Sequence, residues 1–183
     1  MKGLVVRLAA VAAALSLTGC LVSETPLLTA LNATATPIGP GQYDACSHSA
    51  EHETSDCNSL SVELGEGGDY AFLVDEDRIG ARFLTIGGDD YALQMTDDDG
   101  EGYHYYWARR DGGGMSLVMI WCEDLPAALV DAMIANALIE ADEQRQTCTA
   151  KSLAAVVDAA KAYAAGEAVA DEQLTLTPQA AAR

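Results

Sequence analysis

Residues 60–95 read LSVELGEGGDYAFLVDEDRIGARFLTIGGDDYALQM, and this stretch decides the predicted fold. Apolar and polar residues alternate along it, for example at Tyr70, Phe72 and Val74, which share one face of an extended chain. Turns rich in glycine and acidic residues interrupt the alternation about every ten residues, as in antiparallel β-hairpins. The stretch therefore predicts a β-meander.

The alternation continues to residue 122, and helical spacing of apolar residues follows it. Residues 103–109 and 115–122 are expected as further strands, and the second is apolar on both faces, which requires a cover on its second face. Segments 125–138 and 153–163 have helical spacing and can supply that cover. We therefore expect an α+β fold, an antiparallel β-meander of about six strands that can curl into a partial barrel, followed by two C-terminal helices.

The composition is typical of one globular domain with a strongly acidic charge. The chain has 183 residues, of which 50% are hydrophobic, and carries 28 acidic against 10 basic side chains, a formal charge of −18. Binding to a nucleic acid relies on Lys and Arg side chains that displace counterions from phosphates. The charge therefore excludes nucleic acid as a partner.

The first twenty residues have the layout of a secretory signal. Lys2 and Arg7 form a basic start, and residues 8–17 are apolar except for Ser16. This apolar stretch is too short to span a bilayer, which takes about 20 residues. It suits an export signal that is later removed.

Leu17-Thr18-Gly19-Cys20, at the end of the apolar stretch, resembles the lipobox of bacterial lipoproteins. The resemblance implies that residues 1–19 are removed and that Cys20 becomes an acylated N-terminus, which anchors the protein in a lipid bilayer without a spanning helix. In such lipoproteins an Asp after the cysteine favours the inner membrane, so Leu21 favours the outer membrane, with the domain facing the periplasm. The alternative is an ordinary signal peptide that contains a cysteine by chance. Removal of residues 1–19 leaves 8 basic and 28 acidic side chains, a formal charge of −20.

Residues 20–41 are expected to form the lipidated cysteine and a tether. They are rich in Pro, Thr and Ala and carry no charge after Glu24. Leu27, Leu28 and Leu31 provide an alternative, in which a short helical turn docks on the domain.

The expected organisation is a single folded domain behind the signal and the tether. Its last part, residues 173–177, can add a short strand. The expected boundaries are 1–19 for the signal peptide, 20–41 for the lipidated cysteine and tether, 42–177 for the α+β domain and 178–183 for a frayed tail.

Four cysteines besides Cys20 predict two disulfides, because an exported chain enters an oxidising compartment. Four cysteines allow three connectivities. We favour the pairs nearest in sequence, Cys46 with Cys57 and Cys122 with Cys148. The second pair lies at the two ends of the first expected helix and would hold it against the last strand of the meander.

His48, Glu51 and His52 match the H-x-x-E-H pattern of inverzincins, in which two histidines one helical turn apart bind zinc and the glutamate activates water. The motif lies in the predicted first disulfide loop, in a polar stretch without an apolar helical stripe. A short loop with exposed histidines is therefore the favoured interpretation. A non-catalytic metal site, completed by Glu53 or Asp56, is a second hypothesis.

Residues 97–102, DDDGEG, have the acidic first, third and fifth positions of a calcium loop. The twelfth position is Ala108, where such a loop needs a bidentate glutamate. Acidic residues also recur in the other predicted turns. The favoured interpretation is a set of solvated turns that keep the sheet soluble and block edge pairing.

Tyr103, Tyr105 and Trp107 share one face of an expected strand, with His104 on the opposite face. Three aromatic rings in a row can form a platform that binds a sugar or a peptide. Core and cross-strand packing is the favoured interpretation, because aromatic residues are common in strands. For His104 we expect a packed or surface position and not the role of a catalytic base.

The sequence contains no Gly-x-Ser-x-Gly nucleophile elbow and no phosphate-binding glycine loop. We therefore expect no catalysis and no cofactor. The expected function is an acidic interaction or structural module of the bacterial cell envelope, whose partner, besides the lipid bilayer, is a basic envelope protein or a cationic peptide. The alternatives are a ligand- or metal-binding module that uses the acidic loops or the aromatic strand and, more remotely, an H-x-x-E-H metallohydrolase.

Overall fold

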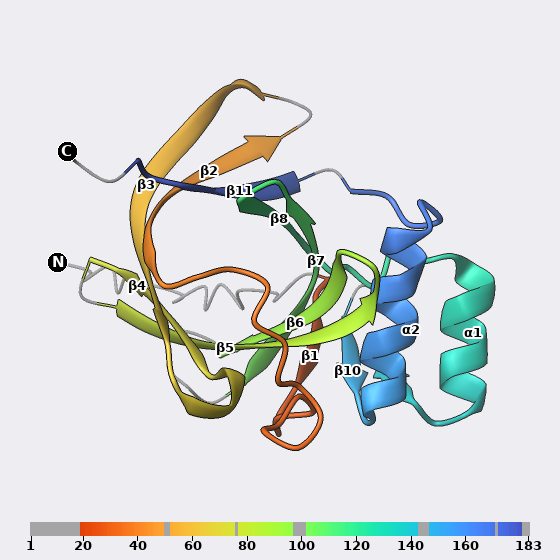
Figure 1. Cartoon of the computed structure of the whole chain (residues 1–183). Helices are drawn as coiled ribbons and strands as arrows, with labels where there is room; N and C mark the ends of the chain where they lie inside the picture. Colours follow the sequence, from red (N-terminus) through yellow and green to blue (C-terminus); the bar gives the residue numbers. More distant parts are fainter. Residues whose placement is uncertain are drawn as a thin grey trace, which may run out of the picture.

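The computed structural model describes residues 19–49, 52–75, 77–96, 102–142, 147–170 and 172–180, and it consists largely of β-strands (Figure 1). The strands are β1 (Leu21–Ser23), β2 (Gly41–Ser49), β3 (His52–Leu64), β4 (Tyr70–Val74), β5 (Asp77–Gly87), β6 (Asp90–Thr96), β7 (Tyr103–Asp111), β8 (Gly114–Met119), β9 (Ile139–Ala141), β10 (Cys148–Ala150) and β11 (Glu172–Pro178). The helices are α1 (Ala127–Ala135) and α2 (Leu153–Ala164), and a 3-10 turn spans Glu66–Gly68.

Eight of the strands close into an antiparallel barrel in the order β2, β3, β4, β5, β6, β7, β8 and β11. Each strand pairs with the next, and β11 closes the ring by pairing with β8 on one side and with β2 on the other. The short strands β1, β10 and β9 extend the sheet from the beginning of β7.

The expected α+β fold with a partial meander of about six strands is therefore wrong, because the fold is mainly β and the barrel is closed. Gly41, expected in the tether, and residues 46–57, expected as a disulfide loop, belong to the long β2–β3 hairpin, and β11 inserts between β8 and β2. The hairpin has a weak sequence pattern, and few of its described side chains are buried. Tyr43 and Leu60 are buried, whereas residues 57–59 are exposed.

Large apolar side chains fill the barrel interior. Alternate residues of the strands point inward, and Tyr70, Phe83 and Leu93 are at most 3% exposed. The rings of Tyr70 and Phe83 meet edge to face with centroids 5.1 Å apart, an arrangement that adds about 1 kcal/mol to the burial of their area. The Tyr70 hydroxyl donates to the Ile38 carbonyl at 2.7 Å, and burial raises the pKa of this hydroxyl to about 12. The interior is thus a packed core.

A second core lies between the outer face of the barrel and the helices. α2 lies against β6 and β7, and α1 lies on the far side of α2 (Figure 1). The Trp107 ring of β7 stacks on the Tyr163 ring of α2 with centroids 6.2 Å apart. α2 begins after Ser152, whose hydroxyl accepts the Ala155 N–H at 3.4 Å. The described helices include none that is long and apolar enough to cross a membrane.

Residues 20–41 lie on the barrel instead of extending from it as the expected tether. Gln94 of β6 explains the docking: its Oε1 accepts the N–H groups of Leu27 and Leu28 at 2.9 Å each, and its Nε2 donates to the Leu28 carbonyl at 3.1 Å. Leu28 and Gln94 are both buried, so these hydrogen bonds satisfy groups that water does not reach. Leu31, in contrast, is 97% exposed. The alternative, in which Leu27, Leu28 and Leu31 all dock on the domain, is therefore right for Leu27 and Leu28 and wrong for Leu31.

Candidate functional site

Cys20, the residue that the lipobox resemblance marks for acylation, belongs to the folded body. The chain at this residue runs between the end of the barrel strand β8 and the short strand β10. The Gly19 carbonyl accepts the Cys122 N–H at 2.8 Å, and the Cys20 carbonyl accepts the Cys148 N–H at 3.3 Å. The backbone on both sides of Cys20 is thus bonded to a neighbouring segment.

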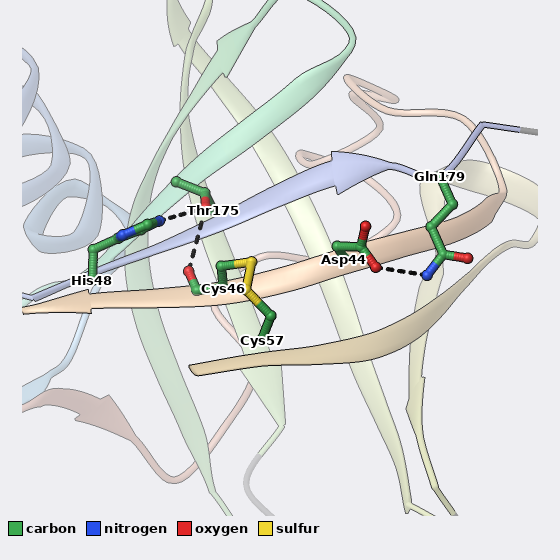
Figure 2. Close-up of a disulfide and its surroundings, with 6 residues drawn as sticks. All are labelled: Asp44, Cys46, His48, Cys57, Thr175 and Gln179. Carbon is green, nitrogen blue, oxygen red and sulfur yellow. Dashed lines mark hydrogen bonds between the residues drawn. A yellow bond between two sulfur atoms is a disulfide. The ribbon is translucent and has the colours of Figure 1, made fainter. Parts of the chain in front are cut away.

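A disulfide joins the two segments that flank Cys20. Cys122 and Cys148 are paired with their Cα atoms 5.8 Å apart, and both side chains are buried. Because Cys122 donates its N–H to Gly19 and Cys148 donates its N–H to Cys20, the pair closes a clamp around Cys20. Cys46 and Cys57 form the second pair, on the outer face of the β2–β3 hairpin (Figure 2). The structure thus confirms both pairings predicted from the sequence.

The Cys20 side chain is partly buried in the folded domain. Its Sγ lies 3.1 Å from the Met119 Sδ. Burial raises the pKa of this thiol and outweighs the opposing effect of a backbone hydrogen bond. Since the thiolate is the form that attacks electrophiles and binds metals, the raised pKa argues against a redox or metal role for the thiol at neutral pH.

The H-x-x-E-H motif lies on the β2–β3 hairpin and not on a helix. His48 belongs to β2 and His52 begins β3, so the helical spacing that a zinc hydrolase needs is not formed. The His48 Nε2 makes a hydrogen bond of 3.1 Å with the Thr175 Oγ1 of β11 (Figure 2). Glu51 and the side chain of His52 lie outside the described residues. Within the described part of the chain, no three His, Cys, Asp or Glu side chains are grouped to hold a metal ion.

The aromatic residues of β7 are packing residues more than a binding platform. Tyr105 is fully buried, and its hydroxyl shares a hydrogen bond of 2.7 Å with the Ser23 hydroxyl. Trp107, stacked on α2, donates its Nε1–H to Asp90 at 2.9 Å. Tyr103 is half-buried and lines a cavity of about 350 Å³ beside the docked N-terminal segment. Core packing, the favoured interpretation, therefore describes Tyr105 and Trp107.

His104 also occupies a packed position, as expected. It pairs with Met95 of β6 and with Val22 of β1. Its Nδ1 is buried and has no hydrogen-bond partner among the residues that the structure describes.

Arginines pair with acidic residues in one of the hairpin turns. Asp90 binds Arg109 through both carboxylate oxygens, at 2.8 and 3.1 Å, and Asp89 pairs with Arg110 at 2.7 Å. Exposed pairs of this kind contribute up to about 1 kcal/mol each. Residues 97–101, which form most of the calcium-like sequence, lie outside the described residues. In the part of this hairpin that the structure describes, the acidic side chains therefore form ion pairs at the surface.

A cavity of about 360 Å³ opens where β8 and β11 diverge at one end of the barrel. Its lining is largely apolar and comes from β2, β7, β8 and β11, with Tyr106, Leu117, Met119 and Leu174 among the lining residues. The volume is within the range of small-molecule sites. Sequence patterns do not reveal such a cavity, because its walls come from strands far apart in the chain.

The feature that the structure adds to the sequence predictions is the clamp of hydrogen bonds and one disulfide around Cys20. Among the candidates whose side chains the structure describes, His48 lies on the hairpin, whereas Tyr103, Tyr105 and Trp107 pack in the second core, so these residues do not converge on one site. No protein-family model, curated protein or solved structure matches this chain.

Proposed function

We propose that this chain is a lipid-anchored domain of the bacterial cell envelope, attached through Cys20, that binds cationic partners without catalysis. The observation that carries the proposal is the clamp around Cys20, because it joins the residue marked for acylation directly to a disulfide-stabilised fold. Because Cys20 is fixed to the domain, acyl chains on this residue would hold the whole domain close to the bilayer.

The short link between anchor and barrel supports a position at the membrane surface. β1 begins at Leu21, immediately after Cys20. One extended residue spans at most about 3.6 Å, so the domain has no slack with which to move away from the bilayer. Acyl chains on the cysteine provide anchoring without a spanning helix, since each buried methylene contributes about 0.8 kcal/mol.

The hydrogen bonds at Cys20 are compatible with a processed and acylated N-terminus. Removal of residues 1–19 takes away the Gly19 carbonyl, which accepts the Cys122 N–H at 2.8 Å. An acyl group in amide linkage to the Cys20 nitrogen carries its carbonyl at the same bonded position and can accept the same N–H. A free ammonium group would leave the buried N–H without an acceptor, at a cost of about 1 to 3 kcal/mol.

The charge of the chain supports cationic partners. The part that follows residue 19 carries 28 acidic and 8 basic side chains. An excess of this size attracts cationic proteins or peptides over a distance of about 10 Å at 0.1 M salt and repels anionic lipid headgroups. The proposal therefore combines attachment by acyl chains with a surface that stays free for a basic partner.

Fractionation of a bacterium that expresses the full chain tests the anchor. We expect wild-type protein in the membrane fraction, released by detergent but not by high salt, and Cys20→Ser protein that is soluble or unprocessed. Leu31→Ser, a change at an exposed position of the same segment, is the matched control and should behave as wild type. Wild-type protein in the soluble fraction would overturn the proposal.

A further inference from the structure

The barrel strand β3 is longer than its neighbour β4, which leaves part of its edge open. β3 has 13 residues and β4 has 5. β4 pairs with β3 only from Ser61 to Leu64, whereas β2 pairs with β3 along the hairpin as far as His52. Among the described residues no strand pairs with the β4 side of residues 57–60, and residues 57–59 are exposed.

At this edge the backbone N–H and C=O groups of alternate β3 residues point away from β2. Cys46 and Cys57 are opposite each other with their Cα atoms 4.1 Å apart, which is the short spacing of a non-hydrogen-bonded antiparallel pair. The N–H and C=O groups of Cys57 therefore point to the other side of β3, and by alternation so do those of Ser59. Ser61 has the same parity, and the ladder to β4 begins at that residue.

Elsewhere the fold fills comparable gaps with its N-terminal segment. The Ala35 N–H donates to the Phe83 carbonyl at 3.2 Å, where β5 extends past β4. β1 pairs with the first residues of β7, where β7 extends past β8, as at Val22 and His104. β3 likewise extends past β4, but no described segment covers this part of its edge.

The open edge is held in a fixed shape. The Cys46–Cys57 disulfide joins β2 and β3 at its level, and β11 covers the other side of β2 (Figure 2). The Gln179 Nε2 donates to the Asp44 Oδ1 at 2.7 Å and to the Ser59 Oγ at 3.2 Å, which fixes the Ser59 side chain on the outer face. A strand that is already ordered loses little conformational entropy when another strand pairs with it.

Acidic side chains lie where the open edge meets the barrel. In the β3–β4 ladder the last pair is Ser61 with Leu73, and β4 ends one residue later at Val74, where the turn with Asp75 and Asp77 follows. Both aspartates are exposed. A polypeptide strand that continues the sheet along this edge therefore runs toward two carboxylates, and a cationic segment is favoured over an acidic one.

We propose that the open edge of β3, residues 57–60, binds an extended cationic peptide segment as an additional β-strand. The inference rests on the proposed function, because it names the surface and the binding mode for the cationic partner. Main-chain hydrogen bonds to Cys57 and Ser59 give the affinity of such strand addition, and the neighbouring carboxylates select the charge. A second copy of this chain is disfavoured as the occupant, since it brings the same acidic residues to the edge.

A synthetic peptide of alternating Lys and Val tests the proposal on the full chain, purified from membranes in detergent with its disulfides intact. Fluorescence anisotropy measures binding, and hydrogen exchange measures protection of the Cys57 and Ser59 amides. Ser59→Pro removes one edge N–H that the barrel does not use and should weaken binding about tenfold. The matched control Ser59→Ala keeps the N–H and should bind within about twofold of wild type.

A second experiment changes the peptide and not the protein, so it does not depend on whether Ser59→Pro folds. The same peptide with alternate backbone nitrogens methylated keeps its charge but cannot pair as a strand on the methylated edge, and we expect its binding to be about tenfold weaker. Asp75→Asn combined with Asp77→Asn should weaken binding of the unmodified peptide at low salt. Asn tolerates the left-handed backbone that residue 75 adopts, with φ 52°.

The outcomes separate this inference from the proposed function. Binding that weakens with salt but is unchanged by Ser59→Pro and by methylation of the peptide would overturn strand addition at the β3 edge. The proposal that the chain binds cationic partners would still stand. An absence of peptide binding at low salt overturns both. Protection of Cys57 and Ser59 without peptide, together with a doubled mass in detergent, identifies a second copy as the occupant and also overturns the inference.

Discussion

Substitution of Gln94 tests the docking of the N-terminal segment that follows Cys20 and β1. Gln94→Leu keeps a side chain of similar volume but removes the acceptor for the Leu27 and Leu28 N–H groups and the donor to the Leu28 carbonyl. The Leu28 side chain and Gln94 are buried, so water does not readily replace these partners. At about 1 kcal/mol for each backbone group left without a partner, we expect the free energy of unfolding to fall by about 3 kcal/mol.

Urea denaturation of the full chain in detergent, followed by tryptophan fluorescence, measures this loss. Hydrogen exchange of the peptide that contains Leu27 and Leu28 should show faster exchange in the variant, because opening of the segment becomes local. Leu31→Ser, in the same segment but exposed, is the control and should change the free energy by less than about 0.5 kcal/mol. If Gln94→Leu matches this control in both measurements, the docking argument is refuted.

Three further changes test other parts of the fold. Cys122→Ala combined with Cys148→Ala opens a disulfide with a sequence separation of 26, and should lower the free energy of unfolding by about 3.5 kcal/mol in chemical denaturation; an unchanged midpoint would contradict the clamp. Gly114→Ala places a Cβ against the Leu176 carbonyl where β8 meets β11, and should lower the melting temperature by displacing the strand that closes the barrel, whereas an unaltered melting temperature would disprove that close contact. Stability should fall as the pH rises from about 10 to 12, because the unfolded chain releases the Tyr70 proton near pH 10 and the folded chain near 12; Tyr70→Phe should flatten this decline in denaturation curves recorded against pH, and an equal slope in both proteins would exclude Tyr70 as its source.

The strands from β4 to β8 could be predicted because their signal is local. Tyr70 and Phe72, like Tyr91 and Leu93, alternate in the sequence and all pack in the barrel core, and turns with glycine mark the strand ends. The closure of the barrel could not be predicted in this way. It depends on β11, whose partners in β2 lie more than 120 residues earlier in the chain.

The N-terminal segment was expected as a tether because composition describes flexibility and not contacts. Its docking depends on Gln94, which interrupts the apolar run of β6 and is buried. An amide inside an apolar strand is a sign of a buried hydrogen-bond partner. That sign identifies a contact but not the segment that provides it, so the partner at Leu28 becomes visible only in three dimensions.

The candidate site was predictable in its parts and not in its assembly. Proximity in sequence identified both disulfides, and the lipobox resemblance marked Cys20. The clamp could not be foreseen, because Cys20 meets Cys122 and Cys148 across more than a hundred residues of chain. The H-x-x-E-H motif shows the converse case, since His48 and His52 fit a helical pattern but lie on two paired strands.

The intact mass of the chain, purified from bacterial membranes in detergent without reductant, tests the central claim most directly. We predict a protein that begins at Cys20, carries the mass of acyl chains on that residue, and is four hydrogen atoms lighter than the fully reduced form because both disulfides are closed. A chain that begins at another residue, or one that carries no lipid, would contradict the account.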